Sequence, residues 1–196
     1  MTAGRHPISQ TKNWCTPQKY VDAVTNVFRG QIDLDPCSNV YSTVHASVEY
    51  MLPEHDGLHE SWNYRRIYVN PPYGRDSERG TSISDWFSRI AKAAEEGSSI
   101  QALVPVATNT KHWKEYVYPI ASAICFLYDT RLHFVINGNE DTKGAPMSCC
   151  MLYYGSDVER FSMIFRKHGA VLPLDGIAYP STNNVKIIED NCDLLL

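Results

Sequence analysis

The sequence predicts a layered α/β fold, in which helices flank a mostly parallel sheet and an antiparallel strand pair lies near the end of the domain. Helix and strand signals alternate without internal repeats, and the strand signals are short apolar runs, typical of strands buried on both faces. A chain of 196 residues, 43% of them hydrophobic, can bury one sizeable core. We therefore expect one domain over residues 13–172, between a polar N-terminal tail (1–12) and a C-terminal extension of unassigned structure (173–196).

The predicted fold begins with a helix. Thr16 is a suitable N-cap, Pro17 suits the first helical position, and apolar residues at helical spacing continue until Gly30. The stretch QIDLD then predicts a strand that ends at Asp35.

A second buried strand is predicted over IYV, residues 67–69. It ends at Asn70, because the two prolines that follow cannot continue a central strand. The pattern between residues 41 and 64 is weak, so no element is predicted there. The polar, glycine-bounded loop GRDSERGTS (74–82) leads to a helix over 83–94, whose apolar residues share one face.

The second half of the chain continues the alternation. We expect a strand over IQALVPV (100–106), a helix from Thr110 to residue 121, a strand over AICFLY (123–128), an antiparallel pair formed by RLHFVI (131–136) and MSCCMLYY (147–154), and a helix over 158–167. Asn137-Gly138 marks the expected turn between the paired strands.

Charge and composition exclude several classes of protein. The net charge is −4 with a pI of about 5.9, so a strongly basic nucleic-acid-binding surface is absent and any nucleic-acid contact must be local. The six cysteines lack metal-ligand spacing, which predicts free thiols and no metal site. No signal core or membrane-spanning run is present, so we expect a cytoplasmic protein.

The turn after the second strand indicates chemistry on a flat amine. In an open α/β sheet, ligands bind beyond the carboxyl ends of the strands. There, the Asn70 side-chain oxygen and the Pro71 carbonyl can accept both hydrogens of one amino group, while Tyr73 stacks on the ring that carries it. Two such acceptors favour tetrahedral geometry at an adenine amine, which is otherwise a poor nucleophile.

The tetrapeptide NPPY resembles the catalytic motif of amino-group methyltransferases. The segments WCTPQKYVDAV, IDLDPCSN, HDGLHESW, IYVNPPYG, ALVPVATNTKHW and RLHF…GAPMS…LYYG occur in the order seen in the phage-type DNA N6-adenine methyltransferase (Dam) family. This resemblance implies a class I methyltransferase (Rossmann-like) fold and methyl transfer from S-adenosylmethionine to N6 of a flipped adenine in double-stranded DNA. It also implies the host cytoplasm as location for a phage-encoded member. Asn70 and Pro71 would orient the amine, Pro72 would stiffen the loop, and Tyr73 would stack on the base.

The resemblance also implies a cofactor site. Its candidate residues are Trp14, Thr16, Pro17, Asp35, Pro36, Cys37 and Asp56, with DPCSN standing where many methyltransferases have a glycine loop. Simpler interpretations remain: Thr16 and Pro17 only start a helix, Trp14 only packs on that helix, and Asp56 is a turn residue. Glu49 is a weaker candidate for the cofactor's ribose.

The candidate DNA contacts are basic residues close to the expected site. Arg75 and Arg79 flank the catalytic turn, and Lys111 and Arg131 follow the carboxyl ends of strands. The alternatives are that the two loop arginines pair with neighbouring acidic residues and that Lys111 lies on a solvated helix face.

Two other functions fit the same residues. One is methylation of another planar amine, cytosine N4 or a protein glutamine. The other is a catalytically silent module that binds cofactor or DNA. The sequence carries no signal for the DNA recognition sequence or the oligomeric state.

Overall fold

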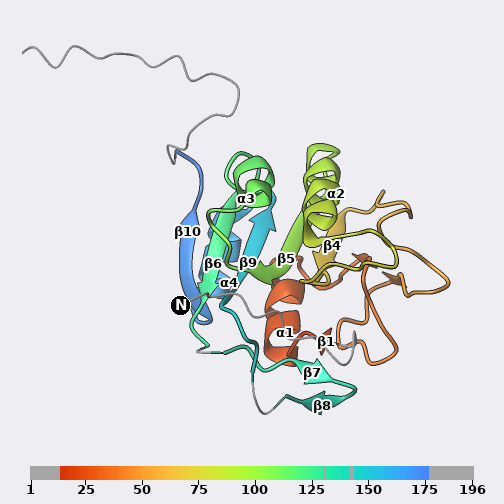
Figure 1. Ribbon diagram of the computed structural model, residues 1–196. Helices are drawn as coiled ribbons and strands as arrows, with labels where there is room; N and C mark the ends of the chain where they lie inside the picture. Colours follow the sequence, from red (N-terminus) through yellow and green to blue (C-terminus); the bar gives the residue numbers. More distant parts are fainter. Residues whose placement is uncertain (1–13, 130, 142–143, 177–196) are drawn as a thin grey trace, which may run out of the picture.

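The computed structural model describes residues 14–129, 131–141 and 144–176. Within these ranges a seven-stranded sheet runs in the order β10-β6-β9-β5-β4-β2-β3 (Figure 1). Its strands are β2 (Leu34–Asp35), β3 (Val48–Glu49), β4 (Arg66–Val69), β5 (Ser99–Pro105), β6 (Ala123–Leu127), β9 (Cys149–Tyr154) and β10 (Gly169–Pro173). The expected N-terminal tail and most of the expected C-terminal extension lie outside the described residues.

The sheet is mixed. Strands β3, β2, β4 and β5 are parallel neighbours, whereas β9 lies antiparallel between β5 and β6, and β10 lies antiparallel on β6. Strand β6 therefore runs in the same direction as β5, so β2, β3, β4, β5 and β6 point their carboxyl ends to one edge, whereas β9 and β10 run the opposite way. The predicted α/β architecture is confirmed in this form.

The predicted pairing of residues 131–136 with 147–154 is wrong. Strand β9 pairs with β5 and β6, while β7 (Val135–Ile136) pairs with β8 (Asn139–Glu140) and with β1 (Trp14–Cys15) in a separate small sheet. The physical reason is burial. Leu132 and Phe134 do not pair with the main sheet, because their side chains are buried in the hydrophobic core on one face of it. The predicted turn at Asn137-Gly138 is confirmed as the turn of the β7–β8 hairpin.

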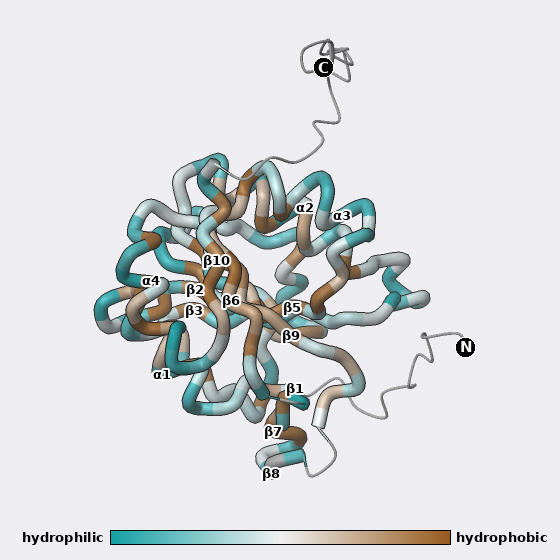
Figure 2. Tube along the Cα trace, turned by 90° about the vertical axis from the view of Figure 1, so that its left-hand side faces the viewer, coloured by the Kyte–Doolittle hydropathy of each residue, from teal (hydrophilic) through white to brown (hydrophobic). Residues whose placement is uncertain are grey.

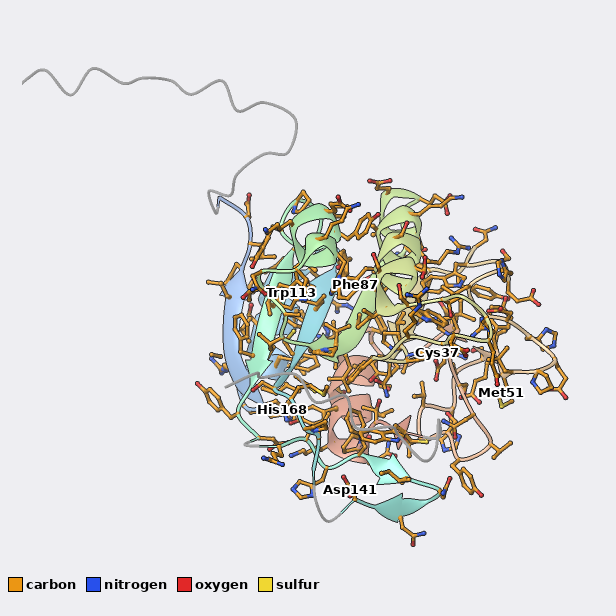
Figure 3. All side chains as sticks on the ribbon, in the orientation of Figure 1. Cys37, Met51, Phe87, Trp113, Asp141 and His168 are labelled. Atoms are coloured by element: carbon orange, nitrogen blue, oxygen red, sulfur yellow. The ribbon has the colours of Figure 1, made fainter. Side chains whose placement is uncertain are left out.

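Helices cover both faces of the main sheet. α2 (Ile83–Glu95) and α3 (Lys111–Tyr116) lie on one face, where Phe87 and Trp113 fill the space between helices and sheet (Figure 3). α1 (Gln18–Val27) and α4 (Val158–Phe165) belong to the core on the other face. Figure 2 shows the hydrophobic segments concentrated in the strands between these layers.

Alternate residues of strand β4 are buried in the hydrophobic cores on opposite faces of the sheet. Ile67 and Val69 face the α2–α3 core, and Tyr68 between them faces the α1–α4 core. All three side chains are fully buried, as the apolar run IYV predicted.

Two helix predictions need correction. Pro17, rather than Thr16, occupies the N-cap of α1, and no side chain caps this helix. The Thr16 hydroxyl instead makes a 2.6 Å hydrogen bond with the Tyr68 hydroxyl inside the protein. The helix expected from Thr110 to residue 121 ends at Tyr116.

None of the described helices has the length and apolar character that a membrane crossing requires.

Candidate active site

The candidate site lies at the carboxyl edge of β2 and β4. These strands are parallel neighbours, with Leu34 opposite Ile67, so Asp35 and Asn70 come to the same edge. A small cavity, partly open to solvent, lies there. Its lining residues are Trp14, Cys15, Thr16, Asp35, Cys37, Ser38, Asn39, Ser42, Thr43, Val44, Tyr68 and Asn70. Of the predicted cofactor residues, Pro17, Pro36 and Asp56 do not line the cavity.

The Asn70 side chain has a fixed orientation. Its Nδ2 donates a 3.1 Å hydrogen bond to the Trp14 carbonyl of β1. Within the described residues, Oδ1 has no protein partner and is left as an acceptor. Pro71 is buried, and none of the described backbone N–H groups donates to its carbonyl. Two oxygen acceptors therefore follow β4 directly.

Tyr73 is held by an aromatic neighbour and by its own hydroxyl. The hydroxyl donates to the Leu103 carbonyl at 3.3 Å, and the ring meets Phe134 edge-on at 6.1 Å between centroids. Phe134 also contacts the Trp14 ring at 5.2 Å. Burial raises the pKa of the Tyr73 hydroxyl well above its ordinary value, so the side chain stays neutral.

Asp35 is a buried carboxyl group at the end of β2. Its Oδ1 accepts a 3.1 Å hydrogen bond from the Cys37 N–H, and only 5% of the residue is exposed. Burial raises its pKa from 3.8 to about 7, against the opposing effect of the Cys37 hydrogen bond. Nearby Glu49 raises it further. Such a carboxylate is stabilised by a cationic or hydrogen-bond-donating ligand.

The loop after β2, residues 36–46, is tied down over the cavity. The Thr43 hydroxyl donates to the Thr16 carbonyl at 2.6 Å, and the Cys15 thiol donates to the Tyr41 carbonyl at 3.2 Å. Glu49 of β3 accepts hydrogen bonds from the Ser42 hydroxyl at 2.8 Å and from the Ala46 N–H at 3.2 Å. These contacts join the loop to β1 and β3.

Asp56 contacts the loop after β4. Its carboxylate forms an ion pair with Arg79 and accepts a 3.1 Å hydrogen bond from the Leu58 N–H. Arg79 thus pairs with Asp56, 23 positions earlier, instead of with Glu78 beside it. The adjoining Gly57 lies against the Pro36 backbone: an added Cβ would be 1.7 Å from the Pro36 carbonyl oxygen.

The other predicted DNA contacts are exposed. Arg75 and Arg131 lie at the surface, and Lys111, with 82% of its side chain exposed, forms an ion pair with Glu115 at 3.6 Å. None of the four predicted cations lines the cavity.

Comparison with known proteins identifies the family. The family model described as DNA N-6-adenine-methyltransferase (Dam) matches residues 4–171. The chain belongs to this family. A DNA N-6-adenine-methyltransferase of Haemophilus phage HP1 is 23% identical over 137 residues, which cover 70% of this chain and 74% of the relative. No solved structure matches the chain. The predicted family is confirmed, and with it the activity of a DNA adenine-N6 methyltransferase.

The structure adds residues to this Dam-family site that the sequence pattern did not indicate. Phe134 was hidden because RLHFVI was interpreted as a strand of the main sheet. Tyr68 was interpreted only as a core residue, and Ser42, Thr43 and Val44 of the cavity wall fall in the region of weak pattern. Chain separation explains these misses, because each contact joins segments that are distant in sequence.

Proposed function

We propose that this Dam-family chain transfers a methyl group from S-adenosylmethionine to N6 of an adenine extruded from double-stranded DNA, on a class I methyltransferase (Rossmann-like) fold. The observation that carries the proposal is the anchored Asn70 amide. Because Nδ2 is bound to the Trp14 carbonyl, Oδ1 is the atom presented to a ligand.

Asn70 and Pro71 act on the amine of the target base. Oδ1 and the Pro71 carbonyl accept its two hydrogens, which draws the nitrogen out of conjugation with the ring and directs its lone pair towards the methyl donor. The interaction strengthens as positive charge develops on the nitrogen, so it belongs mainly to the transition state. Tyr73 stacks on the ring, and its hydroxyl bond to Leu103 fixes the plane in which it does so.

The residues of the cavity suit S-adenosylmethionine. The Trp14 indole Nε1 is buried and has no hydrogen-bond partner among the described residues, a state that favours an acceptor on a ligand. Asp35 offers a buried carboxylate to a cationic group, while Glu49, opposite Asp35 in the β2–β3 pairing, lies outside the cavity lining and holds the loop after β2. When bound, the cofactor supplies an electrophilic methyl group on a sulfonium. The cavity must widen for a cofactor of this size.

DNA approaches from the same edge. The exposed Arg75 and Arg131 contact DNA phosphates, while Arg79 orders the loop after β4 through its ion pair with Asp56. We place this reaction in the cytoplasm, that of the host for a phage-encoded chain.

Labelled transfer tests the proposal against its rivals. Purified protein is incubated with duplex DNA and methyl-labelled S-adenosylmethionine, and the digested nucleosides are separated by mass spectrometry. We expect label in N6-methyladenine. Label in N4-methylcytosine or in protein alone would support the other planar amines, and cofactor binding without any transfer would support the silent module.

A further inference from the structure

The β7–β8 hairpin presents two amide side chains at a narrow tip. Asn137 (φ +50°) and Gly138 (φ +80°) form the left-handed, two-residue turn typical of tight hairpins. Asn137, Gly138 and Asn139 are all exposed, and the Asn139 amide donates to the Asn137 carbonyl at 3.3 Å. Figure 1 shows the hairpin beyond the end of α1, outside the main sheet.

The hairpin is connected to the catalytic turn through short contacts. Strand β7 pairs with β1, where Ile136 lies opposite Trp14, and the Trp14 carbonyl holds the Asn70 amide. Phe134, immediately before β7, packs against Tyr73. The hairpin therefore has a fixed position relative to Asn70 and Tyr73 of the catalytic turn.

Exposed apolar residues of the loop after β2 adjoin this tip. Val40 is 81% exposed and Tyr41 42% exposed, and a Cβ added at Gly138 would lie 3.7 Å from the Tyr41 ring. The resulting surface, which we call the tip surface, consists of Val40, Tyr41, Asn137, Gly138 and Asn139. None of these five residues is charged.

We propose that the tip surface reads the bases that flank the target adenine. This inference rests on the proposed function. A surface without cations is poorly suited to phosphates, whereas amides and apolar groups match base edges: Asn pairs with adenine N6 and N7, and apolar side chains contact the thymine methyl group. A two-stranded β-ribbon fits the major groove, so the hairpin enters that groove with its tip.

The test uses a pool of duplexes with one fixed adenine and randomised flanks. Methylated products are captured and sequenced for the wild-type chain, for the double variant Asn137→Gly/Asn139→Ala, and for Asn63→Ala as matched control. Glycine at position 137 tolerates the left-handed φ while it removes the amide. Asn63 is exposed and precedes β4, at the opposite edge of the sheet.

We expect the wild-type chain and Asn63→Ala to share one set of flanking preferences. In the double variant, discrimination at one or two base pairs should fall about 5- to 150-fold each, with an unchanged dependence of DNA affinity on salt. Unchanged preferences in the double variant would overturn the inference, as would a wild-type enzyme indifferent to its flanks. A uniform loss with a shallower salt dependence would show phosphate contact instead. Wild-type protein that transfers no methyl group to DNA would refute the proposed function itself.

Discussion

The two loops that form the site differ in how the protein holds them. The loop after β2 is tied to β1 and β3 by several hydrogen bonds, and Gly57 lies directly against its Pro36 backbone. The loop after β4 is anchored at Asn70, at Tyr73 and through Arg79, but Gly74 and Gly80 have open space around them.

This difference matches two different demands. A cofactor site benefits from one prebuilt wall even where the rest of the cavity must widen, since a preorganised wall loses less entropy on binding. A loop that must accommodate an extruded base needs firm support only at the residues that act on that base. The next four predictions, ordered from the largest expected effect to the smallest, test this contrast.

The largest effect should come from the close contact at Gly57. Gly57→Ala places a methyl group against the Pro36 carbonyl oxygen, so the backbone must shift and the free energy of unfolding should fall by about 3 kcal/mol. Gly74→Ala, where no atom lies within 4 Å of the added Cβ, is the matched control in the other loop. Denaturant unfolding measures both variants. If Gly57→Ala and Gly74→Ala lowered the free energy of unfolding equally, the two loops would not differ in how firmly the protein holds them.

Asp35 should control cofactor affinity in a pH-dependent way. Asp35→Ala should weaken S-adenosylmethionine binding by about 1–3 kcal/mol, measured by calorimetry. In the wild-type protein the carboxyl group must ionise to bind a cation, so affinity should rise with pH up to about 7 and then level off.

The raised pKa of Asp35 also determines how the stability of the unliganded protein changes with pH. Without ligand, this group favours folding most below its ordinary pKa of 3.8, and that contribution is lost as pH rises to about 7. Asp35→Asn should abolish both pH dependences. A wild-type affinity that is flat between pH 5 and pH 8 would exclude Asp35 from the cofactor site.

Two substitutions of Tyr73 should distinguish stacking of its ring on the target base from the hydrogen bond of its hydroxyl to Leu103. Tyr73→Ala should weaken binding of DNA with an extruded adenine by about 1–3 kcal/mol. Tyr73→Phe keeps the ring but loses the bond to Leu103, and should lower the free energy of unfolding by about 0.5–1.5 kcal/mol with DNA binding nearly intact. DNA binding is measured by fluorescence titration with a duplex that carries an abasic site opposite the target adenine. Equal DNA affinities for Phe and Ala would rule out stacking.

The smallest effects should distinguish the two loop arginines. Arg75→Ala should reduce the slope of log DNA affinity against log salt by about one, because a phosphate contact is lost. Arg79→Ala should change the slope less, since Arg79 already pairs with Asp56. Arg65→Ala, exposed at the amino end of β4, should leave the slope unchanged. A larger slope change for Arg79 than for Arg75 would reverse the assignment.

The part of the fold that depends on local pattern could be predicted from the sequence. The strand before Asn70, the helix α2 and strand β5 follow from continuous apolar runs and from helical spacing of apolar residues. The two-residue strands β1 and β3 could not be predicted, because their pairing partners, and not their own residues, define them.

The candidate site shows the same division. Asn70, Pro71 and Asp35 could be identified from their positions at strand ends. The Arg79–Asp56 ion pair, the Phe134 contact with Tyr73 and the Thr16 bond to Tyr68 join distant segments, so only the tertiary structure reveals them.

The central claim is that Asn70 acts on the amine in the transition state, and single-turnover methyl transfer tests it most directly. Wild-type protein and Asn70→Ala are compared on the same duplex, with cofactor and DNA affinities measured in parallel. We predict a rate reduced by about 2–4 kcal/mol of activation free energy, roughly 30- to 900-fold, with cofactor affinity nearly unchanged. A rate within a few-fold of wild type, or a loss explained wholly by weaker cofactor binding, would contradict the account.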